Sequence, residues 1–282
     1  MTACQLLIEL CLYLYSVEYM AEKCDIRFFR PRGALMPYVR YYYVLACGTP
    51  LRTLTFPTGC PQFIFHRKAP LVVPELSTVQ SRFTISGQVN FSAHVESDGN
   101  TEMIVAVFHP HTVGMFIDTP PSAFYNQEIS GFDLGRRHLN VLADRILECN
   151  DTDLAVRILE EGLMARVRDS LNIERIGATI NAILRRPAIS VHDLAGIACL
   201  CKKQFERVFR ENVGMNPKEY CIIARFQKAL AMLQSGTREY ADVAYGSGYA
   251  DQSHFIRDFR RICGFTPKDL VEYQSPYSDL YR

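Results

Sequence analysis

The sequence predicts an α+β protein: a small β-rich domain, then a helical linker, then an all-helical C-terminal domain. Two observations support this order. Between residues 27 and 109, short runs of β-branched and aromatic residues alternate with Pro, Gly, Asn and Asp, which is typical of strands and turns. After residue 135, apolar residues recur at helical spacing, and one helical unit occurs twice. The 282 residues suffice for two domains that each bury a core.

The first 19 residues contain an apolar run from Leu6 to Tyr15. Glu9 interrupts this run, no Lys or Arg precedes it, and no small-residue cleavage pattern follows it, so we do not expect secretion. The run is also too short to span a membrane. We interpret residues 1–19 as a non-native or disordered extension, with Met20 as the natural start.

The β-rich domain is expected over residues 20–134, with strands at 38–46, 62–66, 71–73, 82–86 and 103–109. Short, regularly spaced strands favour a small sandwich or barrel. Its aromatic residues suggest an effector pocket, although alternation points only half of each strand inward. A filled core is the alternative to that pocket. The expected lining residues are Tyr41, Tyr43, Phe63, Phe65 and Phe108.

Helices are expected again over the linker, residues 135–171. Leu139, Leu142 and Ile146 share one helical face, and a second helix begins after a cap at Asp151 or Thr152. These helices either pair two subunits, which would make a homodimer, or only cover the β-rich domain.

The domain at 172–282 contains a motif written twice, with every pair of identical residues 50 positions apart. Seven identities in one register indicate one supersecondary unit used twice, and its pattern is that of a helix-turn-helix. The first copy comprises Phe205, Arg207, Phe209, Arg210, Gly214, Pro217 and Lys218, and the second comprises Phe255, Arg257, Phe259, Arg260, Gly264, Pro267 and Lys268.

Each copy predicts an amphipathic second helix, at about 202–212 and about 251–262. In the first, Phe205, Val208 and Phe209 face the core, and in the second Phe255, Phe259 and Ile262 do so. Ser190 is expected to cap the helix before the first turn. Between the copies, residues 217–233 read as one long helix that would fix the distance between the two units, about 34 Å if they enter successive major grooves.

Residues 172–273 resemble the DNA-binding domain of the AraC/XylS family of bacterial transcription regulators, most closely over GYADQSHFIRDFRRICGFTPKDL at 248–270. The resemblance implies two helix-turn-helix units joined by a long helix, with double-stranded DNA and RNA polymerase as partners. Together with PYVRYYYVL, FPTGCPQFIF and FHPHTVGMF, it also implies a cupin-like sensor domain at the N-terminus. Cys201 and Ala250 stand where the family usually has a capping Ser, so both recognition helices are expected to be held less firmly.

The outward residues of the two helices are the expected DNA contacts, because long cationic and polar side chains reach base edges and phosphates. On a single helix such charges would more often be merely solvated, but their duplication favours DNA. We expect base contacts from Lys203, Glu206, Arg207, Ser253, Ile256 and Arg257. We expect phosphate contacts from Lys202, Arg210, Lys218, Gln252, Arg260 and Lys268.

Charge and cysteine content are compatible with a cytoplasmic regulator. The net charge is +1, but residues 171–282 carry 16 Lys and Arg against 12 Asp and Glu, a modest basic bias. The ten cysteines are scattered through apolar and helical contexts, which indicates reduced thiols. Cys199, Cys201 and Cys221 lack the spacing of a zinc site.

Two other classes of protein share features with this sequence. His66, His109 and His111 invite a metal site, and hence a cupin-type metal-dependent enzyme with a DNA-binding appendage, but no Glu follows the His-x-His pair at the usual spacing. An alkylation-repair protein would need a zinc-bound cysteine cluster. We therefore expect no metal, no cofactor, no membrane contact and no enzyme activity, and a small-molecule effector only if it binds two states of the protein differently.

Overall fold

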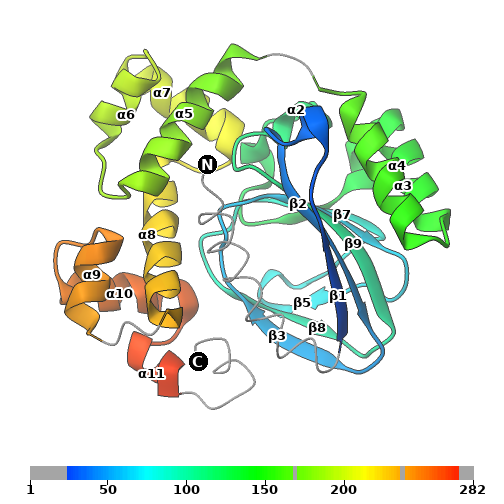
Figure 1. Cartoon of the computed structure of the whole chain (residues 1–282), viewed down its shortest axis with the longest axis horizontal. Coiled ribbons are helices and arrows are strands. Elements are labelled where there is room, and N and C mark those ends of the chain that lie inside the picture. Colours follow the sequence, from blue (N-terminus) through cyan, green and yellow to red (C-terminus); the bar gives the residue numbers. More distant parts are fainter. Residues whose placement is uncertain (1–23, 168–169, 236–238, 273–282) are drawn as a thin grey trace.

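The computed structural model describes residues 24–167, 170–235 and 239–272, so the proposed extension at 1–19 lies outside the described residues. Figure 1 shows the β-rich domain on one side, with α3 (Arg137–Glu148) and α4 (Thr152–Met164) at its outer edge, and the helical domain on the other. The long helix α8 (Pro217–Gln234) runs through the helical domain and has α7 (Lys202–Val213) near one end and α10 (Gln252–Cys263) near the other.

The β-rich domain consists of two antiparallel sheets rather than a closed barrel, because among the described strands none of one sheet pairs with a strand of the other. The six-stranded sheet has the order β1-β2-β9-β4-β7-β10 and the four-stranded sheet the order β3-β8-β5-β6. The strands are β1 (Cys24–Phe29), β2 (Val39–Cys47), β3 (Leu51–Thr55), β4 (Gln62–His66), β5 (Val72–Val73), β6 (Thr78–Val79), β7 (Phe83–Ser86), β8 (Ala93–Ser97), β9 (Thr101–Phe108) and β10 (Glu128–Ser130). Four 3₁₀ turns and a short helix connect them: η1 (Gly33–Leu35), η2 (Pro74–Leu76), α2 (Gly114–Ile117), η3 (Pro121–Phe124) and η4 (Gly131–Leu134).

The two faces of the large sheet bury different cores, because successive side chains of a strand point in opposite directions. Tyr42, Phe63 and Phe83 belong to the cluster that packs against α3 and α4. Tyr43, Ile64 and Val105 belong to the cluster that faces the small sheet, which also contains Leu51 of β3.

One expectation about the cysteines is wrong. Cys24 and Cys47 form a disulfide, with their Cα atoms 4.3 Å apart. The physical reason is the register of β1 and β2, which places these two residues directly opposite each other at the edge of the large sheet. The sequence did not predict β1, so this pairing could not be foreseen.

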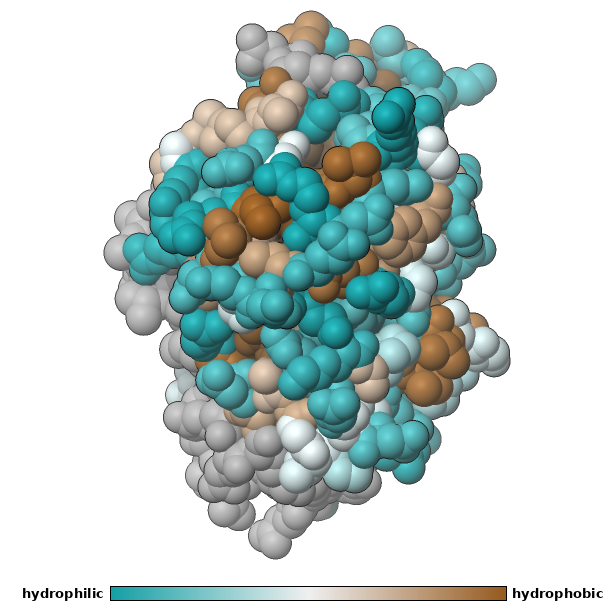
Figure 2. All heavy atoms as spheres, turned by 90° about the vertical axis from the view of Figure 1, so that its right-hand side faces the viewer, coloured by the Kyte–Doolittle hydropathy of each residue, from teal (hydrophilic) through white to brown (hydrophobic). Residues whose placement is uncertain are grey.

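The linker forms two helices, α3 (Arg137–Glu148) and α4 (Thr152–Met164). The Asp151 side chain caps α4 by accepting a hydrogen bond from the Leu154 backbone N–H at 2.9 Å. The inner faces of α3 and α4 join the core of the β-rich domain. On their outer faces, Val141 and Leu154 are 50% and 42% exposed. Figure 2 views the molecule from the side on which α3 and α4 lie and shows apolar areas set among hydrophilic ones.

The C-terminal domain is entirely helical over its described residues. The two helices predicted at about 202–212 and 251–262 end within one residue of the observed α7 and α10. Gly214 and Gly264 stop these helices with φ of +99° and +82°. Phe205, Phe209 and their repeats Phe255 and Phe259 are fully buried. The helices are α5 (Leu171–Arg185), α6 (Val191–Ile197), α7 (Lys202–Val213), α8 (Pro217–Gln234), α9 (Tyr240–Ser247), α10 (Gln252–Cys263) and α11 (Pro267–Glu272).

The β-rich domain contacts both helix-turn-helix units. Near the first, the Tyr125 hydroxyl donates to the Glu219 carboxylate at 3.2 Å, and burial together with Glu219 raises the pKa of Tyr125 to about 12. Beside α8, the Phe56 and Phe226 rings lie 6.0 Å apart. Near the second unit, the Ser92 backbone N–H donates to the Ile262 carbonyl at 2.9 Å. The β-rich domain therefore contacts both units directly.

Candidate nucleic-acid interface

The first recognition helix, α7, turns one face inward and the other toward solvent. Phe205, Val208, Phe209 and Val213 are buried. The residues expected to contact DNA from this helix are all exposed: Lys202, Lys203, Glu206, Arg207 and Arg210. The amphipathic pattern therefore leaves the cationic face available to a ligand.

Arg207 is exposed but not free of partners. Its Nη1 lies 3.1 and 3.3 Å from the two carboxylate oxygens of Glu211, one helical turn further on. Both side chains are largely exposed, at 63% and 45%. An exposed pair of this kind contributes about 0.3–0.5 kcal/mol, so a base or phosphate can replace Glu211 at small cost.

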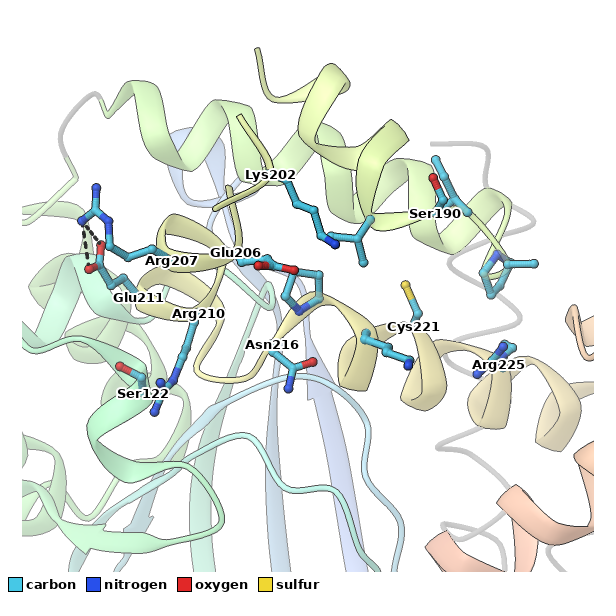
Figure 3. Close-up of a pocket in the computed structure, with 16 residues that line it drawn as sticks. Ser122, Ser190, Lys202, Glu206, Arg207, Arg210, Glu211, Asn216, Cys221 and Arg225 are labelled. Carbon is cyan, nitrogen blue, oxygen red and sulfur yellow. Dashed lines mark hydrogen bonds and ion pairs between the residues drawn. The ribbon is translucent and has the colours of Figure 1, made fainter. Parts of the chain in front are cut away.

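The outer side of α7 and the beginning of α8 form a cavity of about 1090 Å³, which we call the α7–α8 groove. Its wall carries five cationic side chains and two anionic ones, so its electrostatic potential favours an anion. In Figure 3, the Arg207–Glu211 pair lies at one end of the groove and Arg225 of α8 at the other. The charged lining residues are Lys202, Glu206, Arg207, Arg210, Glu211, Lys218 and Arg225.

The second recognition helix, α10, repeats this arrangement. Phe255, Phe259 and Ile262 are buried, Gln252, Ser253, Arg257 and Arg260 are exposed, and Ile256 is half-buried. A second hollow of about 570 Å³ lies along its outer face, lined by Ser253, Ile256, Arg257, Arg260, Arg261 and Thr266.

The structure therefore brings most of the predicted contact residues together in two places. Five of them line the α7–α8 groove and four line the hollow along α10. Lys203, Gln252 and Lys268 are exposed but line neither cavity.

The two recognition helices differ in how they begin. Cys201 occupies the N-cap of α7 and makes no capping hydrogen bond, as its thiol predicts. The expectation for α10 is wrong, because its cap is Asp251 rather than Ala250. The Asp251 carboxylate accepts from the His254 backbone N–H at 2.7 Å, so the first turn of α10 is held.

Sequence reasoning missed a charged cluster around Asp258 in the middle of α10. Asp258 lies 3.7 Å from Arg225 Nη2 of α8 and 3.3 Å from Arg261 Nη2. The repeat itself carried a signal: Asp258 stands 50 residues after the buried, apolar Val208. A carboxylate at an inward position requires a charged or hydrogen-bonding partner.

The aromatic residues expected to line one effector pocket do not meet. Tyr41 and Tyr43 face the small sheet, where their rings contact that of Phe28 at 6.0 and 6.1 Å. Phe63, Phe65 and Phe108 lie in the core beneath α3 and α4 and are fully buried. The expected five-residue pocket is therefore corrected to two separate aromatic sets on opposite faces of the large sheet.

The three histidines considered as metal ligands each have another environment. His66 is fully buried and its Nε2 lies 2.7 Å from the Gln80 side-chain oxygen. His109 Nε2 lies 3.2 Å from the Met36 carbonyl. Burial lowers the pKa of His109 to about 4 and that of His111 to about 3. Among the described residues, no three His, Cys, Asp or Glu side chains are grouped so that they could hold a metal ion.

Comparison with known proteins adds two matching families. A helix-turn-helix domain matches residues 194–272, and a domain of unknown function (DUF6597) matches residues 27–130. The "Probable transcriptional regulator LumQ" of Photobacterium leiognathi is 27% identical over 223 residues, which cover 72% of this chain and 89% of that protein. An uncharacterized HTH-type transcriptional regulator of Haemophilus influenzae is 26% identical over 112 residues.

The match with the Haemophilus influenzae regulator is local, because it covers only 39% of this chain and 36% of that protein. Among solved structures, ToxT of Vibrio cholerae aligns over 89% of this chain and 98% of its own, at 14% identity and a TM-score of 0.43. No helix of the described residues combines the length and the apolar character that crossing a bilayer requires.

Proposed function

The chain belongs to the AraC family of transcriptional regulators, and from that premise we propose that it binds specific DNA sites by placing α7 and α10 in adjacent major grooves. The observation that carries the proposal is the duplication itself. Two helices with the same buried Phe pair each expose an Arg pair, Arg207 with Arg210 and Arg257 with Arg260. The cationic faces of α7 and α10, which the single helix α8 connects, suit a DNA site made of two blocks.

The proposed base contacts follow the exposed faces. Lys203, Glu206 and Arg207 read the first block, and Ser253, Ile256 and Arg257 read the second. Arg207 and Arg257 have the donors for a bidentate contact to guanine, Glu206 can accept from a cytosine amine, and Ile256 can pack on a thymine methyl. The bare N-cap of α7 and the capped start of α10 imply that the second block is read by the firmer helix.

The proposed phosphate contacts are Lys202, Arg210, Lys218, Gln252, Arg260 and Lys268. Three of these line the α7–α8 groove, whose cationic wall supports binding of the DNA backbone. Such contacts hold the protein in register but carry no sequence information.

In vitro selection from random duplexes tests this function. We expect enrichment of two short blocks about ten base pairs apart, centre to centre. Enrichment of a single block, or of no sequence, would contradict the proposal. The variant with both Arg207 and Arg257 changed to Ala serves as the control, because it keeps both helices but loses both proposed guanine contacts.

For the β-rich domain we propose a cupin-like sensor role. Its two face-to-face sheets and its contacts with both helix-turn-helix units support an effector that alters DNA binding. Phe28 and Tyr41, which are half-buried, are the proposed effector surface, whereas Tyr43 is buried and Phe63, Phe65 and Phe108 are fully buried in the other core. The chain contains 15 Tyr and no Trp, so a ligand-induced change in Tyr fluorescence is assigned to this surface only if Tyr41→Phe abolishes it.

We also propose that two chains pair through α3 and α4, whose outer faces expose Val141 and Leu154, and that the DNA-bound dimer contacts RNA polymerase in the cytoplasm. Sedimentation of the wild-type chain and of a Val141→Lys, Leu154→Lys variant tests the pairing: only the variant should be monomeric.

Since the named relatives are regulators, we propose action by binding rather than by catalysis.

A further inference from the structure

Between the two recognition helices, one inward position changes from an apolar to a charged residue. In α7 this position is Val208, which is apolar and 5% exposed. In α10 the position is Asp258, whose side chain is 14% exposed. Withdrawing a carboxylate from water costs free energy unless a partner compensates, so the partners of Asp258 explain why it can stand there.

Asp258 has three cationic or potentially cationic neighbours. His254 Nε2 at 3.4 Å and Arg261 Nη2 at 3.3 Å belong to α10 itself. Arg225 Nη2, at 3.7 Å, belongs to α8. Among the described residues, Arg225 is thus the partner through which Asp258 joins the second recognition helix to the connecting helix.

The second unit holds Arg225 by another contact as well. The guanidinium carbon of Arg225 lies 4.9 Å from the centre of the Tyr249 ring, and Tyr249 precedes α10 in the turn of the second unit. Tyr249 is 3% exposed and the Arg225 side chain 17% exposed. Cation–π and ionic contacts at low exposure are stronger than at the surface.

This cluster lies where the two units meet. Arg225 also lines the α7–α8 groove, at the end away from the Arg207–Glu211 pair (Figure 3). In the first unit the equivalent position of α7 holds the apolar Val208, which belongs to the buried core of the helical domain. Apolar contacts are non-directional, whereas an ion pair between two helices is lost when either helix rotates.

We propose that Asp258 is a positioning residue for DNA recognition: through Arg225 it fixes the angle of α10 on α8, and with it the spacing of the two DNA blocks. The inference rests on the proposed two-block function and deepens it, because it assigns spacing selectivity to an ion pair away from the bases.

The test replaces Asp258 by Val, the residue of the first copy. Binding is measured on the selected duplex, on duplexes with the blocks moved about two base pairs closer or further apart, and on a duplex that keeps only the α7 block. We expect Asp258→Val to bind the selected duplex about tenfold more weakly, because the second contact loses effective concentration. Its preference among spacings should flatten, and its binding to the α7 block alone should not change.

Four further variants isolate the contact between Asp258 and Arg225. Arg225→Met should reproduce the flattened spacing preference, and the double variant should have no flatter a spacing preference than either single variant, since both remove the same contact. Because Arg225 also lines the α7–α8 groove, the comparison uses the ratio of affinities among spacings, which a uniform loss of backbone binding does not change. Arg261→Ala removes a partner within α10 only; because Arg261 also lines the hollow along α10, its overall affinity should fall, but its preference among spacings should stay that of the wild type. Asp242→Asn removes one exposed negative charge from α9 and therefore controls for the general effect of losing an anion.

Thermal melting establishes that each variant is folded, and Asp258→Asn replaces Asp258→Val if the latter does not fold. The proposal is overturned if the folded Asp258 variant keeps the wild-type spacing preference, or if the effects of Asp258→Val and Arg225→Met simply add. If the wild-type protein itself selects no two-block site, the proposed function fails, and this inference fails with it.

Discussion

Replacing Arg207 by Ala is expected to weaken binding to the selected duplex about tenfold and to relax the preference for guanine at one position. A bidentate Arg–guanine contact contributes about 1–3 kcal/mol of discrimination. Arg207 must first leave Glu211, whose carboxylate oxygens lie 3.1 and 3.3 Å from its Nη1. That exposed pair contributes about 0.3–0.5 kcal/mol. The net loss is therefore about 1.5 kcal/mol, or roughly a factor of ten in Kd.

Arg257 provides an internal comparison, because no described residue forms a salt bridge with it. The same substitution at Arg257 should cost about 2 kcal/mol, or roughly thirtyfold. The assay is titration of a labelled duplex at fixed salt, with every single-base variant of each block. Such a set separates loss of affinity from loss of base preference.

Glu211→Gln completes this prediction. In the wild-type background it should raise affinity about twofold, because Arg207 no longer gives up an ion pair. In the Arg207→Ala background the gain from freeing Arg207 should disappear. Unchanged affinity and unchanged base preference in both Arg207→Ala and Arg257→Ala would refute the assigned contacts.

Five other changes have defined outcomes. Lys218→Ala should weaken binding to all duplexes alike and lower the slope of log K against log salt by about one, measured by titration at several salt concentrations. Asp251→Ala should lower the free energy of unfolding by about 1 kcal/mol, because α10 loses its cap, whereas Cys201→Ser should raise it by about 0.5–1 kcal/mol; chemical denaturation measures both. His109 and His111 have folded pKa values of about 4 and about 3, below the unfolded value, so the unfolded chain binds more protons as the pH falls below about 6.5. Stability should therefore fall from about pH 6.5 toward pH 4, and replacing both by Gln should flatten that loss in pH-dependent melts. Reducing the Cys24–Cys47 disulfide, which closes a loop with a sequence separation of 23, should cost about 3 kcal/mol, and Cys24→Ser with Cys47→Ser should remove the difference between oxidised and reduced samples.

The helical half of the fold was predictable because its signals are local. The apolar spacing from Phe205 to Val213 sets the face of α7, and Gly214 and Pro217 set its end and the start of α8. The same residues recur 50 positions later, so two helices and the rod between them could be located from the sequence alone.

The arrangement of side chains across the sheet was not predictable, because it depends on strand register. Tyr43 of β2 pairs with Val105 of β9, whereas Phe63 of β4 pairs with Ala106, the next residue. Neighbouring residues of a strand point to opposite faces, so these two aromatic side chains lie on opposite sides of the sheet. No property of a single segment reveals this.

Tertiary contacts between distant segments were equally hidden. Asp258 meets Arg225 across 33 positions of sequence, and Tyr125 of the β-rich domain meets Glu219 across 94. Comparing the two copies of the repeat would have marked Asp258 as the position where an apolar residue is replaced by a charge. It would not have identified Arg225.

The most direct test of two-helix recognition is guanine N7 methylation interference on the selected duplex. We expect two clusters of interfering guanines on one face of the DNA, about one helical turn apart. Arg207→Ala should abolish interference in one cluster only, and Arg257→Ala in the other only. A single cluster, or clusters on opposite faces of the duplex, would contradict recognition by a pair of equivalent helices.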